Sequence, residues 1–470
     1  MLQHEDVALN PHERLTRRSL LKNTAMGFGA IALADILSRD SRTEEPALLQ
    51  THFAPRAKRV IFLFMHGGPS AIDTFDYKPL LERDDGKPLP FEKPRIQFAQ
   101  TGNLLRSPWK FRQYGQSGAW VSDLFPEVGK CVDDLCFIKS MHGSNEAHGG
   151  ALLKIHTGSD TFVRPSKGAW ISYGLGTENA NLPAFVTINP TLGHGGVQNF
   201  GSGFLPPEHQ ATRIGSSGAA MKNASIANLI PPNAKRYDQR KQLDFVQKLN
   251  QHQLDRFQQA AELDARIESL ELAFRMQMEA PDVLNLAQET DATHQLYGID
   301  QPATENFGRE CLLARRLSES GVRFVQVSHA YWDQHSELKE KHSELAAQVD
   351  RPIAGLLKDL KQRGLLEDTL VIWGAEFGRT PTAQGNNGRD HNPHAFTYWF
   401  AGGGVKPGFS YGQSDDYGFY AVDQKVHVHD YHATLLHLLG LDHEKLTFHY
   451  GGRDFRLTDV HGRVIHDIMT

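Results

Sequence analysis

The chain has 470 residues, with 50 lysines and arginines against 55 aspartates and glutamates and a formal net charge of -5. This balance leaves no excess of basic residues for binding nucleic acid, so we expect no nucleic-acid partner. Three cysteines, Cys131, Cys136 and Cys311, allow one disulfide at most and do not have the spacing of a zinc ribbon. The 24 histidines and 42 glycines favour a metalloenzyme, because imidazole binds metals and glycine permits tight loops.

The N-terminal segment has the pattern of a twin-arginine export signal. Arg17 and Arg18 lie in the sequence TRRSLLK, and residues 24–37 after it are mostly apolar and contain no basic residue. The alternative is an ordinary amphipathic helix with two adjacent arginines. We expect residues 1–45 to be a signal segment and linker, read by the twin-arginine translocation machinery. The protein would then be periplasmic or otherwise exported, with the signal cleaved near residues 34–46 or kept as an anchor.

Three continuous apolar runs, at residues 59–65, 322–328 and 369–373, are predicted to be buried parallel strands. Helical patterns precede the second and third runs, and glycine follows each pattern where a helix C-terminus favours it. Helices that alternate with buried strands predict an α/β fold with a doubly wound, mostly parallel sheet and helices on both faces. We expect one such domain over residues 58–470.

The helical patterns cover residues 305–320 and 343–363, closed by Gly321 and Gly364, and further strands are expected at 184–188 and 396–401.

A helical insertion is expected at about residues 234–280, where apolar residues recur three to four positions apart. One interpretation is a coiled coil with a partner. Because the apolar stripe does not keep a strict seven-residue repeat, packing of this segment on the body of the domain is the favoured interpretation.

Polar side chains that bind metals follow each of the three apolar runs. The carboxyl ends of parallel strands meet at one edge of a sheet, so these side chains are expected within roughly 10 Å of one another, as a divalent metal site requires. Taken singly, such residues are more often helix caps or solvated surface. They are His66 and Asp73 after the first run, Asp333 and His335 after the second, Glu376 after the third, and Asp390, His391 and His394 in a glycine-rich loop.

A helix is also predicted within residues 140–158, starting near Asn145. It would place Ser144, Asn145 and His148 around its N-terminus, where free amides and the helix dipole favour an anion. The alternative is an asparagine-capped helix in which His148 only supports the cap. His156, later in the same helix, is expected to face away from the site.

With these motifs, the chain resembles the exported family called domain of unknown function 1501, a sulfatase-like branch of the alkaline phosphatase superfamily. The resemblance extends from about residue 58 to the C-terminus. The motifs that carry it are MHGGPS at residues 65–70 with DTFD at 73–76, WISYGLG at 170–176, WDQH at 332–335, GAEFGRTP at 374–381 and GRDHNP at 388–393.

The resemblance implies a doubly wound sheet in which metal ions hold a phosphate or sulfate ester for in-line attack. Glu376 would take the position of a metal-binding aspartate of sulfatases, and His66 would lie near the first metal-binding carboxylates. His148 fills the position of the cysteine that sulfatases convert to formylglycine. No cysteine of this chain lies in that motif. Leu152 stands where the sulfatase motif has arginine, and Phe377 replaces a metal ligand of sulfatases. A formylglycine mechanism is therefore not expected.

We accordingly expect an exported, metal-dependent hydrolase of sulfate or phosphate esters, acting on a small molecule or a polysaccharide. Metal-bound water would be the nucleophile, with the Ser144 hydroxyl as a weaker candidate. The alternative is a catalytically inactive, sulfatase-like binding protein. Zinc, calcium, manganese and magnesium all stay open as the metal.

The expected metal ligands or their immediate supports are His66, Asp73, Asp333, His335, Glu376 and His391, with His394 as an additional candidate. His148 is expected to be a ligand or a proton donor to the leaving group. Arg379, or in its place Arg389, would neutralise the charge of the ester.

Overall fold

The computed structural model describes residues 51–92, 101–223, 226, 240–241, 243–248 and 261–470. They belong to one compact unit, Leu48–Thr470. The predicted export signal at residues 1–45 lies outside the described residues. Within the described part, no helix is both long enough and apolar enough to cross a membrane.

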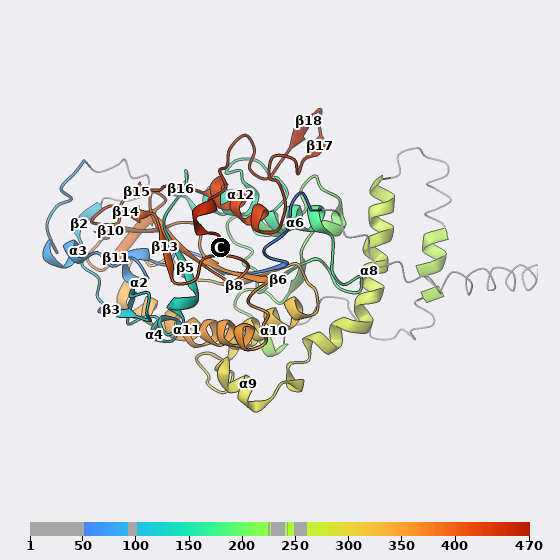
Figure 1. Cartoon of the computed structure of the whole chain (residues 1–470), viewed down its shortest axis with the longest axis horizontal. Coiled ribbons are helices and arrows are strands. Elements are labelled where there is room, and N and C mark those ends of the chain that lie inside the picture. The colour runs from blue at the N-terminus through green and yellow to red at the C-terminus, as the bar shows by residue number, and fades with distance from the viewer. Residues whose placement is uncertain (1–50, 93–100, 224–225, 227–239, 242, 249–260) are drawn as a thin grey trace, which may run out of the picture. The chain divides into compact units, whose positions relative to one another are not determined.

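A nine-stranded sheet forms the centre of this unit, in the order β13-β5-β12-β9-β1-β8-β6-β7, with β16 beside β5. Figure 1 labels β13, β5, β8 and β6 along this sheet. Strand β1 pairs in parallel with both β8 and β9, and β6 pairs in parallel with β8 and β7. Strand β12 runs antiparallel to its neighbours β9 and β5. The sheet is therefore mostly parallel, as predicted.

The strands of this sheet are β1 (Arg59–Met65), β5 (Leu135–His142), β6 (Phe185–Ile188), β7 (Thr212–Ile214), β8 (Phe324–His329), β9 (Thr369–Gly374), β12 (Phe396–Ala401), β13 (Phe409–Tyr411) and β16 (Val426–His427).

Helices cover both faces of the sheet, because side chains alternate along each buried strand. Ile61, Leu63 and Met65 of β1 belong to a core cluster that includes α10 (Glu305–Glu319) and α11 (Leu338–Gln362). Val60, Phe62 and Phe64 belong to a second cluster on the opposite face. The helices of that second cluster are α5 (His148–Thr157), α6 (Lys167–Leu175) and α12 (Val428–Leu438). The doubly wound architecture is thus confirmed.

Two helix ends agree with the glycine signals in the sequence. Helix α10 ends at Glu319 and α11 at Gln362, and Gly321 and Gly364 follow with φ of 95° and 68°, in the left-handed region that favours glycine. The start of α11 lies five residues before the predicted position. Its first residue, Leu338, is 1% exposed, so burial of this side chain extends the helix beyond the region of regular periodicity.

The predicted helical insertion is described in part, as α8 (Ala261–Leu284). Met276, Ala280 and Val283 of this helix are buried in the same core cluster as α10. The described part of the insertion therefore packs on the body of the domain.

The prediction for the α5 segment was wrong by three residues. Helix α5 begins at His148 and not near Asn145, whose Oδ1 instead accepts a hydrogen bond from the Ala147 N–H in the preceding turn. All three cysteines are buried and free, so the one disulfide that the sequence allowed does not form.

A small sheet of order β11-β10-β2 lies beside the central one and supplies part of the site described below. The remaining elements are α2 (Ala71–Thr74), α3 (Pro79–Arg83), β2 (Thr101–Leu104), β3 (Phe111–Tyr114), β4 (Ala119–Ser122), α4 (Pro126–Gly129), α9 (Asp291–Leu296), β10 (Gly378–Gln384), β11 (Gly388–Asn392), β14 (Gln413–Ser414), β15 (Ala421–Asp423), β17 (Phe448–Tyr450) and β18 (Arg453–Phe455).

Candidate metal centre

Histidines and carboxylates from five separate segments converge beyond the carboxyl ends of β1 and β8. His66 follows β1 directly, and Asp333 and His335 lie in the loop after β8. His148 is the first residue of α5, and His391 lies on β11. A parallel sheet delivers the residues after its strands to one edge, which is why positions so distant in sequence meet here.

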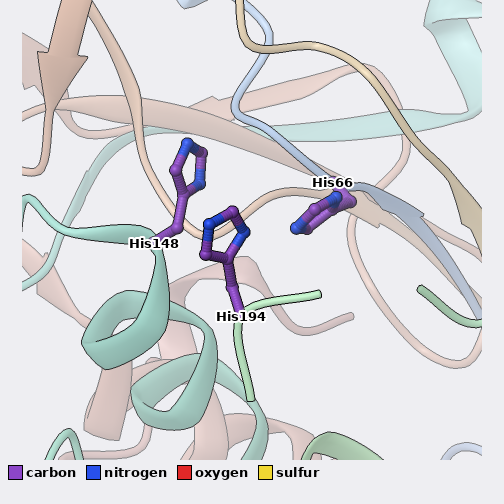
Figure 2. Close-up of side chains that lie close together, drawn as sticks. All are labelled: His66, His148 and His194. Carbon is purple, nitrogen blue, oxygen red and sulfur yellow. The ribbon is translucent and has the colours of Figure 1, made fainter. Parts of the chain in front are cut away.

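Three overlapping groups have potential ligand atoms within 4.8 Å of one another. Figure 2 shows the first group, in which three imidazoles face one another. We call the seven residues that make up the three groups the histidine cluster. The groups are His66, His148 and His194; His148, Asp333 and His391; and His335, Asp390 and His391.

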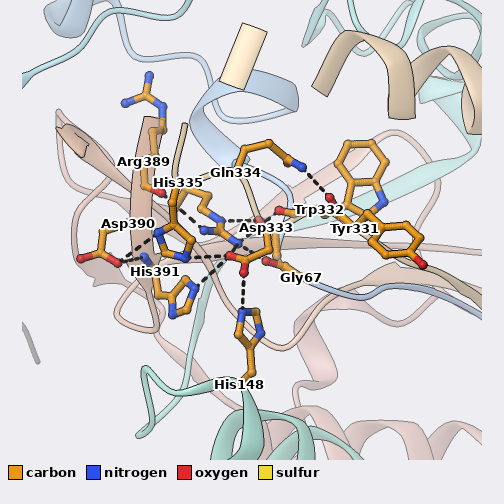
Figure 3. Close-up of polar contacts among 12 residues, drawn as sticks. Gly67, His148, Tyr331, Trp332, Asp333, Gln334, His335, Arg389, Asp390 and His391 are labelled. Atoms are coloured by element: carbon orange, nitrogen blue, oxygen red, sulfur yellow. Dashed lines mark hydrogen bonds and ion pairs between the residues drawn. The ribbon is translucent and has the colours of Figure 1, made fainter. Parts of the chain in front are cut away.

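Asp333 lies at the centre of the histidine cluster, and four cationic or imidazole side chains contact its carboxylate (Figure 3). His148 Nε2 lies 3.1 Å from Oδ2, while His335 Nε2 and His391 Nε2 lie 2.9 and 3.1 Å from Oδ1. An Arg379 N–H donates to Oδ1 at 2.7 Å. The side chain of Asp333 is nevertheless 38% exposed, so this carboxylate is open to solvent or a ligand.

Glu376 lies behind His148 and orients it. Its side chain is fully buried, and Oε1 accepts hydrogen bonds from the Gly67 N–H at 2.9 Å and from His148 Nδ1 at 2.8 Å. Because Nδ1 donates to this carboxylate, Nε2 is the nitrogen turned to Asp333. A carboxylate behind an imidazole in this way fixes the ring of many metal-binding histidines. The structure thus places Glu376 outside the three groups, although the sequence suggested a ligand.

Gly67 allows the backbone to approach this site closely. Its φ is 113°, and a Cβ atom there would lie 2.8 Å from the backbone nitrogens of Trp332 and Asp333. Any side chain at this position would push the β8 loop away from β1. Glycine in the MHGGPS motif therefore lets the loop that carries Asp333 lie directly against the backbone that binds Glu376.

Asp73 does not join the histidine cluster, which corrects its assignment as a ligand. Its two oxygens accept hydrogen bonds from Arg389 at 2.7 and 3.2 Å, and both side chains are fully buried. Arg389 also donates to the carbonyls of Leu105 and Thr380. A guanidinium buried and satisfied in this way is not free to bind an ester, so this pair anchors the β10–β11 hairpin.

Arg379 is likewise buried, with its donors committed to the backbone. It donates to the Gly67, Gly68 and Trp332 carbonyls in addition to Asp333. The structure places it as a positioning residue for Asp333, in a different role from the charge neutralisation predicted for it.

Electrostatics in the cluster favour ionised carboxylates and a charged His148. Burial opposes the ionised form of Asp333, but hydrogen bonds from His148 and His335 and the charge of Arg379 outweigh it and hold the pKa of this carboxyl well below its usual range. Burial also opposes protonation of His148, but hydrogen bonds to Asp333 and Glu376 raise its pKa to about 9. The pKa of His66 is lowered, chiefly by burial.

The donor set fits a divalent metal ion. His391 Nδ1 faces the Glu146 carbonyl at 2.7 Å, so this nitrogen carries the proton and a neutral ring has only a lone pair at Nε2. That lone pair lies 3.1 Å from an Asp333 oxygen, which also only accepts. A cation between them would satisfy both atoms. Burial lowers the pKa of His391, which disfavours a proton as that cation. His66 Nε2 is also buried without a hydrogen-bond partner among the described residues.

Two members of the histidine cluster were not among the ligands predicted from sequence. His194 is exposed, lies in the loop after β6 and has a φ of 48°. The run Gly193-His194-Gly195-Gly196 after a predicted strand was the signal that could have found it. Asp390 was noted beside His391 but not assigned as a ligand. It is 2% exposed and its Oδ2 has no hydrogen-bond partner among the described residues.

Three other candidates lie elsewhere. The His394 ring packs against Phe419 and Tyr420, outside the cluster. The Ser144 hydroxyl donates to Asp160. His156 is buried against Phe64 in the core, with ring centroids 4.7 Å apart, and it belongs to none of the three groups.

The chain belongs to the family described as Protein of unknown function (DUF1501), which it matches over residues 57–469. No curated protein matches its sequence.

Several solved structures are similar at low identity. A sulfatase from a Pseudoalteromonas species is 13% identical with a TM-score of 0.35, covering 82% of this chain and 68% of that one. The phosphonate monoester hydrolase of Silicibacter pomeroyi is 11% identical with a TM-score of 0.35, covering 88% and 76%. A mutant of TAB5 alkaline phosphatase is 10% identical with a TM-score of 0.33, covering 84% and 100%. These likenesses are distant.

Proposed function

We propose that the protein is a metal-dependent hydrolase of sulfate or phosphate esters, with the histidine cluster as its active site. The observation that carries this proposal is the set of three overlapping groups of imidazoles and carboxylates around Asp333. His148 and His391 each belong to two of the groups, so the three groups lie side by side. Sites with two ions are suited to stabilising both the attacking and the leaving oxygen of a transferring ester group.

His66, His148, His194, Asp333, His335, Asp390 and His391 would hold the metal. Imidazole with carboxylate is a donor set typical of zinc or manganese more than of calcium. A divalent ion in such a site lowers the pKa of bound water towards neutrality and polarises the ester oxygens.

The chain itself would orient the ligands and move a proton. Glu376 holds His148 through Nδ1, and Arg379 holds Asp333 through Oδ1, so both ligand side chains are fixed before substrate binds. A protonated imidazole beside the ester can donate its proton to the leaving oxygen, which typically contributes about 10²–10⁴-fold to the rate. His148 can take this role or bind a metal through Nε2, but not both at once, because its Nδ1 is held by Glu376.

Water is the proposed nucleophile because the cysteines are unsuited to the role. Burial raises the pKa of the Cys131 thiol to about 11 and that of Cys136 to about 12, so neither forms a thiolate near neutral pH. Cys311 is fully buried in α10. This supports a route without formylglycine.

We further propose that the protein is exported by the twin-arginine route and acts on a sulfated or phosphorylated small molecule or polysaccharide. The TRRSLLK sequence and the apolar stretch after it support the export proposal. Replacement of Arg17 and Arg18 by lysine should leave the precursor in the cytoplasm, whereas normal export of this variant would contradict it.

One observation favours a second function, ligand binding without turnover. Both arginines that could neutralise a bound ester, Arg379 and Arg389, are fully buried and committed to other partners. A histidine cluster without a free guanidinium would still bind metal and an anion.

The test combines elemental analysis of the exported protein with turnover of aryl sulfate and aryl phosphate esters. The hydrolase requires bound divalent metal and turnover that falls by about 10²-fold or more in His148→Ala. The matched control is His449→Ala, since His449 lies 69% exposed on the β17–β18 hairpin. Bound metal with no turnover of either ester class would support the binding protein, and absence of metal would contradict both functions.

A further inference from the structure

A cavity of about 650 Å³ lies at the N-terminus of α12. Its lining shares no residue with the histidine cluster. The walls come from the loop before α5, from α5 itself, from the start of α12 and from two C-terminal segments. The lining residues that matter here are Ser144, Lys154, His427, His429, Asp430, Glu444, His461 and Arg463.

Imidazoles form one wall of this cavity. The rings of His427 and His429 have centroids 5.0 Å apart, and those of His429 and His461 lie 5.1 Å apart. His429 is 1% exposed, and its Nδ1 has no hydrogen-bond partner among the described residues. An unsatisfied buried polar atom is costly, so this wall lacks a partner that a ligand would provide.

Lys154 brings a positive charge that no carboxylate in the described part of the chain pairs within ion-pair distance. It is half-buried, and burial lowers the pKa of its ammonium group, although the charges of Asp160 and Asp459 act in the opposite direction from beyond ion-pair distance. An anion beside it would offset the cost of burying that charge.

The two acidic residues of the lining are already engaged. Asp430 accepts hydrogen bonds from the backbone N–H groups of His427 and Arg463, one at each oxygen. Glu444 lies 3.4 Å from Arg456. The cavity therefore presents an unpaired ammonium and imidazole N–H donors at a helix N-terminus, where the helix dipole also favours negative charge.

We propose that this cavity is an oxyanion-binding site that takes a sulfate or phosphate group. Lys154 would supply the charge, and His429 and His461 would supply hydrogen bonds. Two sources share this chemistry: the free ion, and a second anionic group on the substrate of the histidine cluster. The second source rests on the proposed function, while oxyanion binding itself does not.

Geometry makes the second source reachable. Lys154 and His148 are six residues apart on α5, which is about 9 Å along a helix axis. A saccharide that carries two sulfates or phosphates spans such a distance, so one group could lie at each site.

The first arm of the test titrates inorganic sulfate into the intact protein by calorimetry. We expect Lys154→Met to lose one equivalent of sulfate or to bind it about tenfold more weakly, and Lys154→Arg to keep it. The control is Lys445→Met, because Lys445 is 70% exposed and pairs with Asp442 outside the cavity. Circular dichroism checks the fold of each variant, and His461→Ala, at an exposed position of the lining, replaces Lys154→Met should that variant fail to fold. Unchanged sulfate binding in a folded cavity variant would overturn the proposal.

The second arm compares a singly and a doubly sulfated substrate. If the second group of the substrate occupies the cavity, Lys154→Met raises KM for the doubly sulfated one alone, by about tenfold, with kcat unchanged. If both KM values stay unchanged while sulfate binding is lost, the ligand is the free ion. If wild type turns over neither these substrates nor their phosphorylated counterparts, the proposed hydrolase is wrong, and the first arm still decides the oxyanion site.

Discussion

Asp333 carries the largest electrostatic load of any carboxylate in the cluster, because three imidazoles and a guanidinium all face it. Gathering these side chains around one exposed carboxylate costs free energy unless a ligand compensates for it. Residues with pKa values strongly displaced by specific neighbours gather at functional sites, where charge is arranged for a ligand and not for the fold alone. In the proposed metal centre, Asp333 and His148 are therefore the two residues whose protonation a bound ion would change most.

Glu376 either binds the metal directly or supports His148. The variant Glu376→Gln distinguishes these two roles. The amide keeps the shape and can still accept the Gly67 N–H, but it no longer holds the His148 ring with a negative charge. If Glu376 supports His148, the substitution should weaken metal binding by about 10–100-fold. Competition with a chromophoric chelator measures this change.

A much larger loss, with metal no longer retained on desalting, would show that Glu376 binds the ion directly. The control is Glu337→Gln, since Glu337 is 59% exposed and pairs only with Lys341. Unchanged affinity in Glu376→Gln would contradict both roles.

For the Asp73–Arg389 pair we predict an effect on stability and not on catalysis. Removing one partner of a buried ion pair leaves an uncompensated charge, so Asp73→Ala should lower the free energy of unfolding by about 3–5 kcal/mol in metal-free protein. Urea denaturation measures it. Asp85→Ala removes a carboxylate from an exposed pair with Arg106 and should cost at most about 1 kcal/mol. Equal effects of the two variants would show that Asp73 does not anchor the hairpin.

At the scale of elements, the strand ends explain what the sequence could predict. His66, Asp333 and His335 follow continuous apolar runs, and a parallel sheet can only deliver such residues to one edge. Asp73 follows the same strand as His66, but the short helix α2 carries it away to Arg389. Local pattern does not show where a turn of helix points, and so this ligand could not be excluded from sequence.

His194 shows the opposite difficulty. Its loop has no periodicity, and glycines on both sides make many backbone paths accessible. One contact at the start of the loop is tertiary: the Asn189 side chain, directly after β6, donates to Glu310 of α10 at 2.6 Å. A contact between residues 121 positions apart leaves no trace in the local sequence.

Glu310 therefore links the His194 loop to α10, and this link should depend on pH. Burial raises the pKa of its carboxyl from 4.5 to about 8. Between these values the folded protein holds a proton that the unfolded chain releases, so the free energy of unfolding should fall as pH rises through this window. Glu310→Gln keeps the hydrogen bonds to Asn189 and Asn306 and removes the titration.

Between pH 5 and pH 8, the free energy of unfolding of Glu310→Gln should increase by about 2–4 kcal/mol relative to that of wild type, since one pKa unit is worth about 1.4 kcal/mol. Denaturant midpoints at several pH values measure this difference. Glu340→Gln, an exposed position on α11, should follow the wild-type curve. Parallel curves for Glu310→Gln and wild type would show that Glu310 is ionised in the folded protein.

At the scale of the whole molecule, the alternation of helices and buried strands was enough to predict a doubly wound sheet. The reversed direction of β12 was not predictable, because an apolar run such as residues 396–401 is compatible with both parallel and antiparallel pairing. The order of the strands depends on pairings between distant segments, such as β1 with β8. The sequence therefore determined the class of fold more fully than the assembly of the site.

Metal binding should stabilise the entire fold, because the ligands are contributed by residues from position 66 to position 391. These residues meet only in the folded chain, so binding free energy adds to folding free energy. A metal present at about 1,000 times its Kd contributes about 4 kcal/mol. Removal of the metal with a chelator should therefore lower Tm by several degrees, and re-addition of the native ion should restore it.

His391→Ala removes a ligand shared by two of the groups, so its Tm should respond much less to the chelator than that of wild type. The exposed His449→Ala variant should respond as wild type does. Losing His391, which belongs to two of the groups, should remove more of the response than losing His194, which belongs to one. If the chelator left the Tm of wild type unchanged while metal analysis confirmed its removal, the histidine cluster would not be linked to folding, and a metal centre built from these seven residues would be wrong.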